Sequence, residues 1–297
     1  MKIKDHTVIG FIGAGVMGKG MATNLLKAGY KLNIHTRTKE KANELFKLGA
    51  VWRNSIKELV QESNVIITMV GSPKDVEDIY FSEAGILENA KRDTFLIDMT
   101  TSKPSLAKRL YQSALTKNLL SLDAPVSGGE KGAKQGKLTI MVGGDKSTYH
   151  QCLSIFNSMG KNIVYKGLAG SGQYTKMCNQ MAMAANMLGV CEAIIFAKKA
   201  GMDPRKVIKT ISNGTSSSWV IENLALQMID GDYRPGFYVK HLVKDLEIAL
   251  ESAQEMNIFT PNLELSLSLF RELADMGEGN KGTRILMKLY EMKSGLV

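Results

Sequence analysis

One stretch decides the fold: Thr7-Val-Ile-Gly-Phe-Ile-Gly13-Ala-Gly15-Val-Met-Gly18. Its first six residues form a β-branched and aromatic run typical of a buried strand, and residues 19–28 then have the pattern of a helix. Between strand and helix, Gly-x-Gly-x-x-Gly permits a tight turn, the approach of the backbone to a pyrophosphate, and close packing of helix on strand. The stretch therefore predicts dinucleotide binding, and a tight turn without a ligand is the alternative.

Strand and helix patterns alternate from this stretch as far as residue 165. Further strands are expected at residues 31–35, 49–52, 64–70, 94–98, 119–125, 138–142 and 162–165, with helices at 41–48, 56–62, 75–81, 103–116 and 146–159. Such alternation predicts a parallel sheet with right-handed crossovers, whose ligands bind beyond the carboxyl ends of the strands. We therefore expect an α/β domain over residues 1–166.

The pattern changes completely after Gly167, where strand signals stop. A long apolar helix is expected at residues 173–199, and further helices at 205–212, 219–228, 237–256, 262–276 and 283–292. Residues 167–297 are therefore predicted to form an all-α domain that begins with the long helix.

The end of the second strand indicates which dinucleotide binds. It contains Thr36, Arg37 and Thr38, with no acidic residue before Glu40. An acidic residue there usually holds the ribose of NAD, whereas an arginine accommodates the 2′-phosphate of NADP. We therefore predict NADP(H) in preference to NAD(H), with Arg37 as the phosphate ligand and Thr38 as a hydroxyl donor. An exposed basic helix start is the alternative, and the helix dipole disfavours it.

Two further segments suggest a site for an anionic substrate. Ser127, Gly128 and Gly129 place a hydroxyl and glycine N–H groups at the end of a strand, which can form a nest for a carboxylate, although a plain turn is an equal alternative. Near the start of the long helix, Lys176 shares a face with Asn179 and Gln180, one turn further on. A solvated surface lysine is the ordinary interpretation of a lone Lys.

Composition narrows the class of protein. The formal net charge is +9, but the lysines are scattered without a dense basic run, so anionic small molecules are favoured over nucleic acid. Cys152, Cys178 and Cys191 lack metal-ligand spacing, which predicts a reducing compartment and no metal site. The short apolar run near the amino terminus does not fit a signal peptide, and no window is expected to span a membrane. A cytoplasmic protein is predicted.

Together these motifs resemble the β-hydroxyacid dehydrogenase family, which includes 3-hydroxyisobutyrate dehydrogenase, tartronate semialdehyde reductase and glyoxylate/succinic semialdehyde reductase. The resemblance extends over essentially the whole chain. The matching motifs are Phe11-Ile-Gly-Ala-Gly-Val-Met-Gly18, Asp98-Met-Thr-Thr101, Asp123-Ala-Pro-Val-Ser-Gly-Gly129, Gly170-Ser-Gly172 with Lys176 and Asn179, and Lys244-Asp245-Leu246. One departure is Thr36, where the family commonly has Asn, which weakens one expected ribose contact.

The resemblance implies a Rossmann domain joined by the long helix to a helical domain, with the active site between them. Lys176 would be the general acid/base. The implied substrate contacts are Ser127, Gly128, Gly129, Thr100 and Asn179, with Gln180 as the alternative amide. The implied cofactor contacts are Gly13, Ala14, Gly15, Val16, Met17, Gly18, Thr36, Arg37, Thr38, Met69, Val70, Thr100 and Lys244.

The expected activity is hydride transfer between NADP(H) and a small 3-hydroxy acid or semialdehyde carboxylate. A lysine that is partly desolvated beside a cationic cofactor ring can have its pKa lowered toward the working pH, as proton transfer to and from the substrate oxygen requires. The alternatives are a catalytically silent NADP-binding sensor or interaction module, and an enzyme related to imine reductases. A homodimer or homotetramer is expected.

Overall fold

The computed structural model describes residues 7–297. The chain divides into two compact units, with the division between Lys176 and Met177. This division lies inside the long helix α9 (Ser171–Lys199), which is continuous across it, and comes later than the boundary at residues 166 and 167 expected from the sequence. The start of α9 therefore groups with the first unit, because Asp123 of that unit accepts hydrogen bonds from the backbone N–H groups of Gly170 and Gln173.

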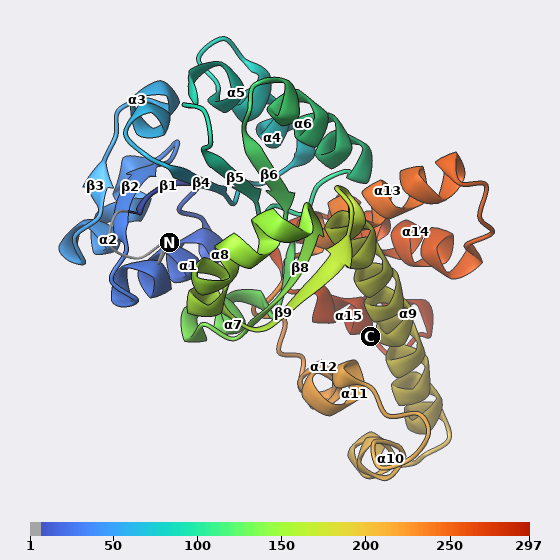
Figure 1. Ribbon diagram of the computed structural model, residues 1–297. Coiled ribbons are helices and arrows are strands. Elements are labelled where there is room, and N and C mark those ends of the chain that lie inside the picture. Colours follow the sequence, from blue (N-terminus) through green and yellow to red (C-terminus); the bar gives the residue numbers. More distant parts are fainter. Residues whose placement is uncertain (1–6) are drawn as a thin grey trace. The chain divides into compact units, whose positions relative to one another are not determined.

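The first unit is built on one sheet. Its strands are β1 (Val8–Ile12), β2 (Lys31–His35), β3 (Val51–Trp52), β4 (Val65–Thr68), β5 (Phe95–Asp98), β6 (Leu120–Asp123), β7 (Val126–Ser127), β8 (Leu138–Gly144) and β9 (Gly160–Gly167). Their order is β3-β2-β1-β4-β5-β6-β8-β7, and β9 pairs with β8 (Figure 1). The strands β1 to β6 pair in parallel, in the order of a doubly wound dinucleotide-binding sheet. The Rossmann prediction is confirmed, but β8 pairs antiparallel with β6 and with β7, so the expectation of a parallel sheet is wrong for this strand.

Helices cover both faces of this sheet. Buried side chains of α1 (Val16–Lys27), α2 (Asn43–Lys47), α7 (Gly129–Gln135) and α8 (Lys146–Met159) pack in one hydrophobic cluster. Those of α3 (Ile56–Gln61), α4 (Pro73–Phe81), α5 (Ile86–Asn89) and α6 (Pro104–Thr116) pack in another. Successive strand residues alternate between the clusters, because side chains alternate across a pleated strand: Ile67 belongs to the first and Ile66 to the second.

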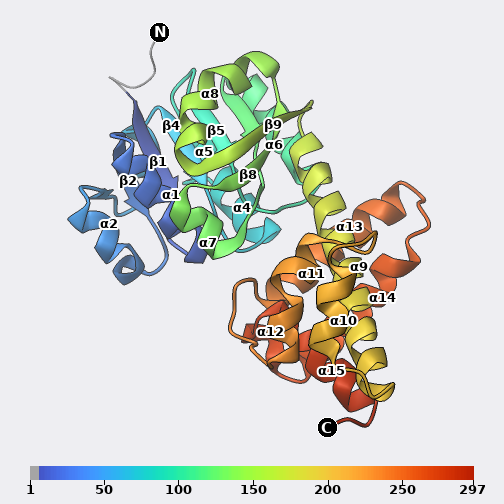
Figure 2. The same ribbon diagram turned by 90° about the horizontal axis from the view of Figure 1, so that it is seen from below.

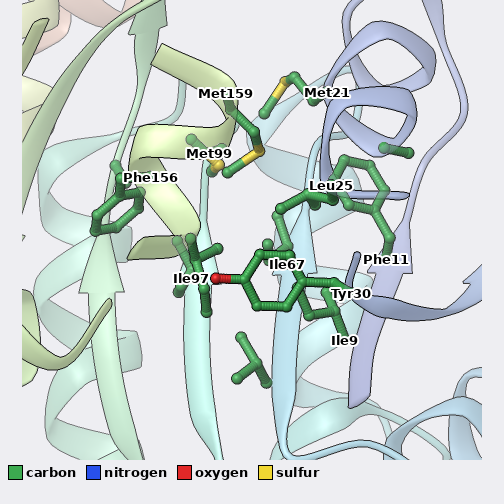
Figure 3. Packing of buried hydrophobic residues seen from close by; sticks show 14 of the residues in the cluster. Ile9, Phe11, Met21, Leu25, Tyr30, Ile67, Ile97, Met99, Phe156 and Met159 are labelled. Atoms are coloured by element: carbon green, nitrogen blue, oxygen red, sulfur yellow. The ribbon is translucent and has the colours of Figure 1, made fainter. Parts of the chain in front are cut away.

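Figure 3 shows the first cluster from close by. Ile67 and Ile97 of the central strands lie among Met21 and Leu25 of α1 and Met159 of α8. All five are completely buried. Burying a side chain of this size stabilises a fold by roughly 1.5–3 kcal/mol, so the packing of α1 on the sheet holds the preceding glycine turn in place.

The second unit is helical, as predicted, and residues 177–297 contain no strand longer than the isolated bridge between Tyr238 and Gly282. Beyond α9 its helices are α10 (Pro204–Ile211), α11 (Trp219–Asn223), α12 (Ala225–Ile229), α13 (Val239–Glu255), α14 (Pro261–Asp275) and α15 (Leu286–Lys293), with short 3-10 turns η3 (Glu278–Asn280) and η4 (Thr283–Ile285). Figure 2 shows them in colours from yellow to red. One hydrophobic cluster joins α9, α13, α14 and α15.

Several local predictions were wrong or incomplete. The helix expected at residues 219–228 is broken at Leu224, which separates α11 from α12. The short helices α5 and α7 were not predicted, because α5 has only four residues and α7 begins at Gly129 and contains a second glycine, Gly132. The first helix begins at Val16, within the glycine motif, and not at Lys19.

The apolar character of α9 also corrects an expectation. Among residues 7–297 it is long and apolar enough to cross a membrane by length and composition, with a mean hydropathy of 1.5 over its most apolar 18-residue window. The expectation that no window approaches this composition is therefore wrong. Of that window, 44% is buried inside the protein, and the core helix of a globular protein meets the same criterion.

Candidate active site

The glycine motif forms a tight turn between β1 and α1. Gly13 has φ +107°, a left-handed conformation that favours glycine, and a Cβ there would collide with the carbonyl oxygen of Met69. A Cβ at Gly18 would collide with the carbonyl oxygen of Gly13. Two of the three glycines are therefore required by the packing of the protein itself.

Gly15 differs from the other two glycines. A Cβ at this position would meet no protein atom within 4 Å, so internal packing does not require glycine there. Gly15 is also the N-cap of α1, which has no side-chain cap and no acidic residue in its first turn. A helix amino terminus of this kind favours an anion, and the bare backbone allows close approach. The turn that also contains Ala14, Val16 and Met17 therefore fits a dinucleotide pyrophosphate.

The end of β2 presents the residues predicted to select the coenzyme. Arg37 is largely exposed, and one of its guanidinium nitrogens lies 3.4 Å from Oδ1 of Asp75 at the start of α4. Thr38 is exposed and is the N-cap residue of η2 (Lys39–Ala42). Its side chain makes no capping hydrogen bond to the backbone of η2. Thr36 is half-buried. The Arg37 and Thr38 side chains are thus accessible to an anion, and their role in coenzyme selection stays a prediction.

The segments that follow β4 and β5 are tied together by Thr100. Its Oγ1 accepts a hydrogen bond from the backbone N–H of Val70 at 3.0 Å. Thr100 is buried, whereas Met69 and Val70 are half-buried. The predicted cofactor-lining segment and Thr100 are therefore brought together by the structure, and the buried hydroxyl already has a protein partner.

A buried carboxylate lies behind Thr100. Oδ1 of Asp98 accepts hydrogen bonds from the hydroxyl of Thr68 at 2.8 Å and from the backbone N–H of Thr100 at 3.1 Å. The Thr68 hydroxyl also lies 3.1 Å from the hydroxyl of Tyr80 on α4. Burial raises the pKa of Asp98 to about 6, although its hydrogen bonds act in the opposite direction. Asp98 was recognised from the sequence only as part of a family motif, and Thr68 and Tyr80 were not predicted.

The predicted carboxylate nest lies where β7 meets α7. Ser127 is half-buried and pairs with Thr139 of β8. Gly128 and Gly129 have φ +128° and +59°, so both adopt conformations that favour glycine. Gly128 is also the N-cap of α7, without a side-chain cap. The segment is thus the start of a helix, not an isolated turn, and its contact with a substrate stays a prediction.

The first turn of α9 is anchored by a buried aspartate. Oδ1 of Asp123, at the end of β6, accepts a hydrogen bond from the N–H of Gly170 at 2.7 Å, and Oδ2 accepts one from the N–H of Gln173 at 2.9 Å. Burial raises the pKa of Asp123, while the backbone donors act to lower it. Two glycines make room for this contact, since a Cβ at Gly143 or Gly172 would lie 2.5 or 2.7 Å from the carboxylate.

The side chain of Gln173 adds a second connection. Its Nε2 donates to the carbonyl oxygen of Thr100 at 2.8 Å, and its Oε1 accepts from the N–H of Ser102 at 3.0 Å. Gln173 is completely buried. Lys176 follows one helical turn later and is also buried, with 6% of its surface exposed. The ordinary interpretation of Lys176 as a solvated surface residue is therefore wrong.

Contacts thus run from the glycine turn to the turn of α9 that carries Lys176. Met69 packs against Gly13, Val70 bonds Thr100, and Thr100 bonds Gln173. Sequence reasoning missed Gln173, although a glutamine between Gly172 and Lys176 in an apolar helix was a signal that could have found it.

The second unit holds the remaining predicted residues in a polar chain. Nδ2 of Asn179 donates to Oε1 of Gln180 at 2.8 Å, and Nε2 of Gln180 donates to Oδ2 of Asp245 at 2.6 Å. Nζ of Lys244 lies 3.0 Å from Oδ1 of Asp245. Gln180 and Asp245 are buried, whereas Asn179 and Lys244 are half-buried.

Comparison with known protein families gives two adjoining matches. A family described as the NAD-binding domain of 6-phosphogluconate dehydrogenase matches residues 8–167. A family described as the NAD-binding of NADP-dependent 3-hydroxyisobutyrate dehydrogenase matches residues 170–290. Together the two matches cover nearly the whole chain.

Individual relatives match along their full length. The oxidoreductase YkwC of Bacillus subtilis is 54% identical, covering 95% of this chain and 98% of the relative. The 2-hydroxy-3-oxopropionate reductase of Escherichia coli is 37% identical, covering 96% and 97%. A solved structure of Mycobacterium tuberculosis 3-hydroxyisobutyrate dehydrogenase with L-serine is 28% identical, with a TM-score of 0.89 over 95% of this chain and 98% of that one. The chain belongs to the β-hydroxyacid dehydrogenase family.

Proposed function

We propose that this chain is an NADP(H)-dependent oxidoreductase that transfers a hydride between the coenzyme and a small 3-hydroxy acid or semialdehyde carboxylate. The observation that carries the proposal is the series of contacts from the glycine turn through Thr100 and Gln173, because it ties the turn bearing Lys176 to the strand ends beside that glycine turn. The names of the Escherichia coli and Mycobacterium tuberculosis relatives support a small hydroxy acid or its oxo form as substrate.

Each group of residues has a distinct task in this proposal. When bound, the nicotinamide coenzyme supplies or accepts the hydride. The backbone of the Gly13 to Gly18 turn binds the pyrophosphate, and Arg37 pairs with the 2′-phosphate. Residues 127–129 hold the substrate carboxylate. Lys176 gives a proton to the carbonyl oxygen during reduction and takes it from the hydroxyl during oxidation.

The direct test is an assay of NADPH and NADH oxidation with succinic, methylmalonic and tartronic semialdehydes and with glyoxylate. Lys176→Ala should lower kcat by about 10²–10⁴-fold, as loss of a general acid/base does, while coenzyme binding measured by fluorescence is retained. The matched control is Lys199→Ala, in the last turn of the same helix and exposed, which should leave kcat unchanged.

Two results would contradict the proposal. An unchanged rate in Lys176→Ala would remove the acid/base role of this residue. Coenzyme binding without turnover across the whole panel would instead support the alternative of a silent NADP-binding module.

A further inference from the structure

The side-chain amide of Gln173 joins two segments of the first unit, although the proposed chemistry gives it no task. Its Nε2 donates to the carbonyl oxygen of Thr100, and its Oε1 accepts from the N–H of Ser102. A backbone N–H only donates and a carbonyl oxygen only accepts, so one orientation of the amide satisfies both partners. Because none of its surface is exposed, Gln173 acts through the groups that it holds.

The first turn of α9 is held from two sides. The carboxylate of Asp123 accepts hydrogen bonds from the backbone N–H groups of Gly170 and Gln173, and so fixes the start of the helix at the end of β6. The side chain of Gln173 bonds the backbone of Thr100 and Ser102, in the segment that follows β5. Without the side-chain amide, the helix start would keep its contact with β6, while the segment after β5 would lose this connection.

The two segments that Gln173 joins carry different parts of the proposed machinery. Lys176 lies one turn further along α9, on the same face as Gln173. Thr100 accepts a hydrogen bond from Val70, in the segment predicted to line the coenzyme. A proton donor has to lie within about 2.6–3.2 Å of the oxygen that it serves, and a misplacement of about 1 Å can lower the rate about 100-fold. The fold must therefore fix the distance between these two segments.

We propose that Gln173 is a positioning residue whose amide sets the distance between Lys176 and the segment that contains Thr100. The inference rests on the proposed function and extends it to a residue that touches neither substrate nor coenzyme. The position requires a donor toward Thr100 and an acceptor toward Ser102. A protonated glutamate has both, whereas an ionised glutamate has no donor. In Gln173→Glu the hydrogen-bond pattern should therefore form and break with pH.

The test compares kcat of Gln173→Glu with kcat of the unaltered full-length protein between about pH 5.5 and pH 9.5. Burial raises the pKa of a glutamate, at most to about 8–9 in documented cases, so the introduced carboxyl is protonated at the acid end and ionised at the alkaline end. The variant should be within about twofold of the unaltered protein at the acid end. The ratio of the two kcat values should then fall at least about tenfold toward the alkaline end.

The ionisable groups around this position act on the introduced glutamate in opposite directions. Asp98 and Asp123 are register partners at the ends of β5 and β6, and when ionised they raise the pKa of a carboxyl beside them. Lys103, next to Ser102 in the chain, and Lys176 are cations that lower it. All four groups are present in both proteins, so division by the kcat of the unaltered protein removes their own titrations.

A second variant removes both hydrogen bonds at every pH. Gln173→Met keeps an unbranched side chain, and we expect kcat to fall about 10- to 100-fold. The dissociation constant of NADPH, measured by fluorescence, should stay within about threefold, because the Gly13 to Gly18 turn is unchanged. Gln151→Glu and Gln151→Met, at an exposed position of α8, are the matched controls and should leave kcat unchanged.

Two results would overturn the inference. One is a Gln173→Glu ratio that stays constant over the whole pH range: a constant high ratio means that the donor is not needed, and a constant low ratio means that the hydrogen-bond pattern is not the cause. The other is a kcat of Gln173→Met within about twofold of the unaltered protein.

Failure of the proposed function would be seen separately, as an unaltered protein that turns over none of the substrates. The role of Gln173 would then be judged by NMR, from the methyl signal of Thr100 and the Cε signal of Lys176. In Gln173→Glu both signals should match those of the unaltered protein at the acid end and depart from them at the alkaline end. Signals that match at both ends would exclude the positioning role, whether or not the protein is active.

Discussion

Asp98 is a carboxylic acid whose burial opposes its ionisation. Its pKa of about 6 lies above the ordinary value of 3.8, so between these pH values the folded protein holds a proton that the unfolded chain has lost. The contribution of Asp98 to stability is therefore largest below about pH 4 and falls as the pH rises through about 6. Over this pH range the contribution of Asp98 to the free energy of unfolding falls by no more than about 3 kcal/mol.

Asp98→Asn should remove this dependence on pH. Both hydrogen bonds go to Oδ1, which an asparagine also provides, so the variant should be as stable at pH 7 as the unaltered protein or more so, by up to about 3 kcal/mol. Urea unfolding at pH 4, 5, 6 and 7 measures the difference. The exposed Asp78→Asn is the control. A stability difference that is the same at all four pH values would contradict the raised pKa.

Arg37 is the residue on which the coenzyme prediction depends. Arg37→Ala removes the guanidinium that would pair with the 2′-phosphate, and we expect the ratio of kcat/KM for NADPH to that for NADH to fall at least about tenfold. Steady-state kinetics with both coenzymes measure it. Arg92→Ala is the control, because Arg92 is exposed and precedes β5, at the opposite edge of the sheet from the carboxyl ends. An equal loss with both coenzymes would exclude Arg37 as the selecting residue.

The helix α9 contains two glycines that differ in the space available for a side chain. A Cβ at Gly172 would lie 2.7 Å from Oδ2 of Asp123 and collide with the carbonyl oxygen of Met141, whereas a Cβ at Gly189 would meet nothing within 4 Å. Gly172→Ala should therefore destabilise the protein by about 1–3 kcal/mol or more. Gly189→Ala should stabilise it by up to about 1 kcal/mol through helix propensity. Thermal unfolding compares the two, and equal effects would contradict this description of the Asp123 contact.

Elements could be predicted from the sequence where a pattern repeats locally. The strands of the parallel sheet are runs such as Val65 to Thr68, and the turn of β1 into α1 is marked by its glycines. The short helix α7 follows Gly128, begins at Gly129 and has no such pattern. The break at Leu224 also falls within a stretch whose pattern is compatible with one helix. Short elements depend on tertiary packing more than on propensity, which explains these errors.

Coenzyme binding should stabilise the whole molecule by mass action. A coenzyme present at about a hundred times its dissociation constant raises the free energy of unfolding by about 2.7 kcal/mol. Because the predicted pyrophosphate contacts lie between β1 and α1, hydrogen exchange should slow first at the amides of Gly15 to Gly18. Hydrogen–deuterium exchange with and without NADPH measures this. Protection confined to residues 177–297 would contradict the assignment of the coenzyme to the first unit.

The candidate site could be predicted only in part, and the missing part has one physical cause. Gly13, Arg37 and Lys176 belong to short motifs that can be recognised locally or through the family resemblance. Gln173, by contrast, bonds Ser102 and Thr100, which are 71 and 73 residues away along the chain. Pairings at such separations leave no periodic pattern in the sequence, so only the fold reveals them.

The anchor of α9 has a consequence for building hybrid enzymes. Asp123, Gly143, Gly172 and Gln173 fit one another as a set, although the last two lie beyond the domain boundary at residue 167 that the sequence predicts. A chimera joined at residue 167 would combine the aspartate of one parent with the helix start of another. A crossover placed after Lys176 keeps the whole set, and with it the proposed acid/base residue, from a single parent.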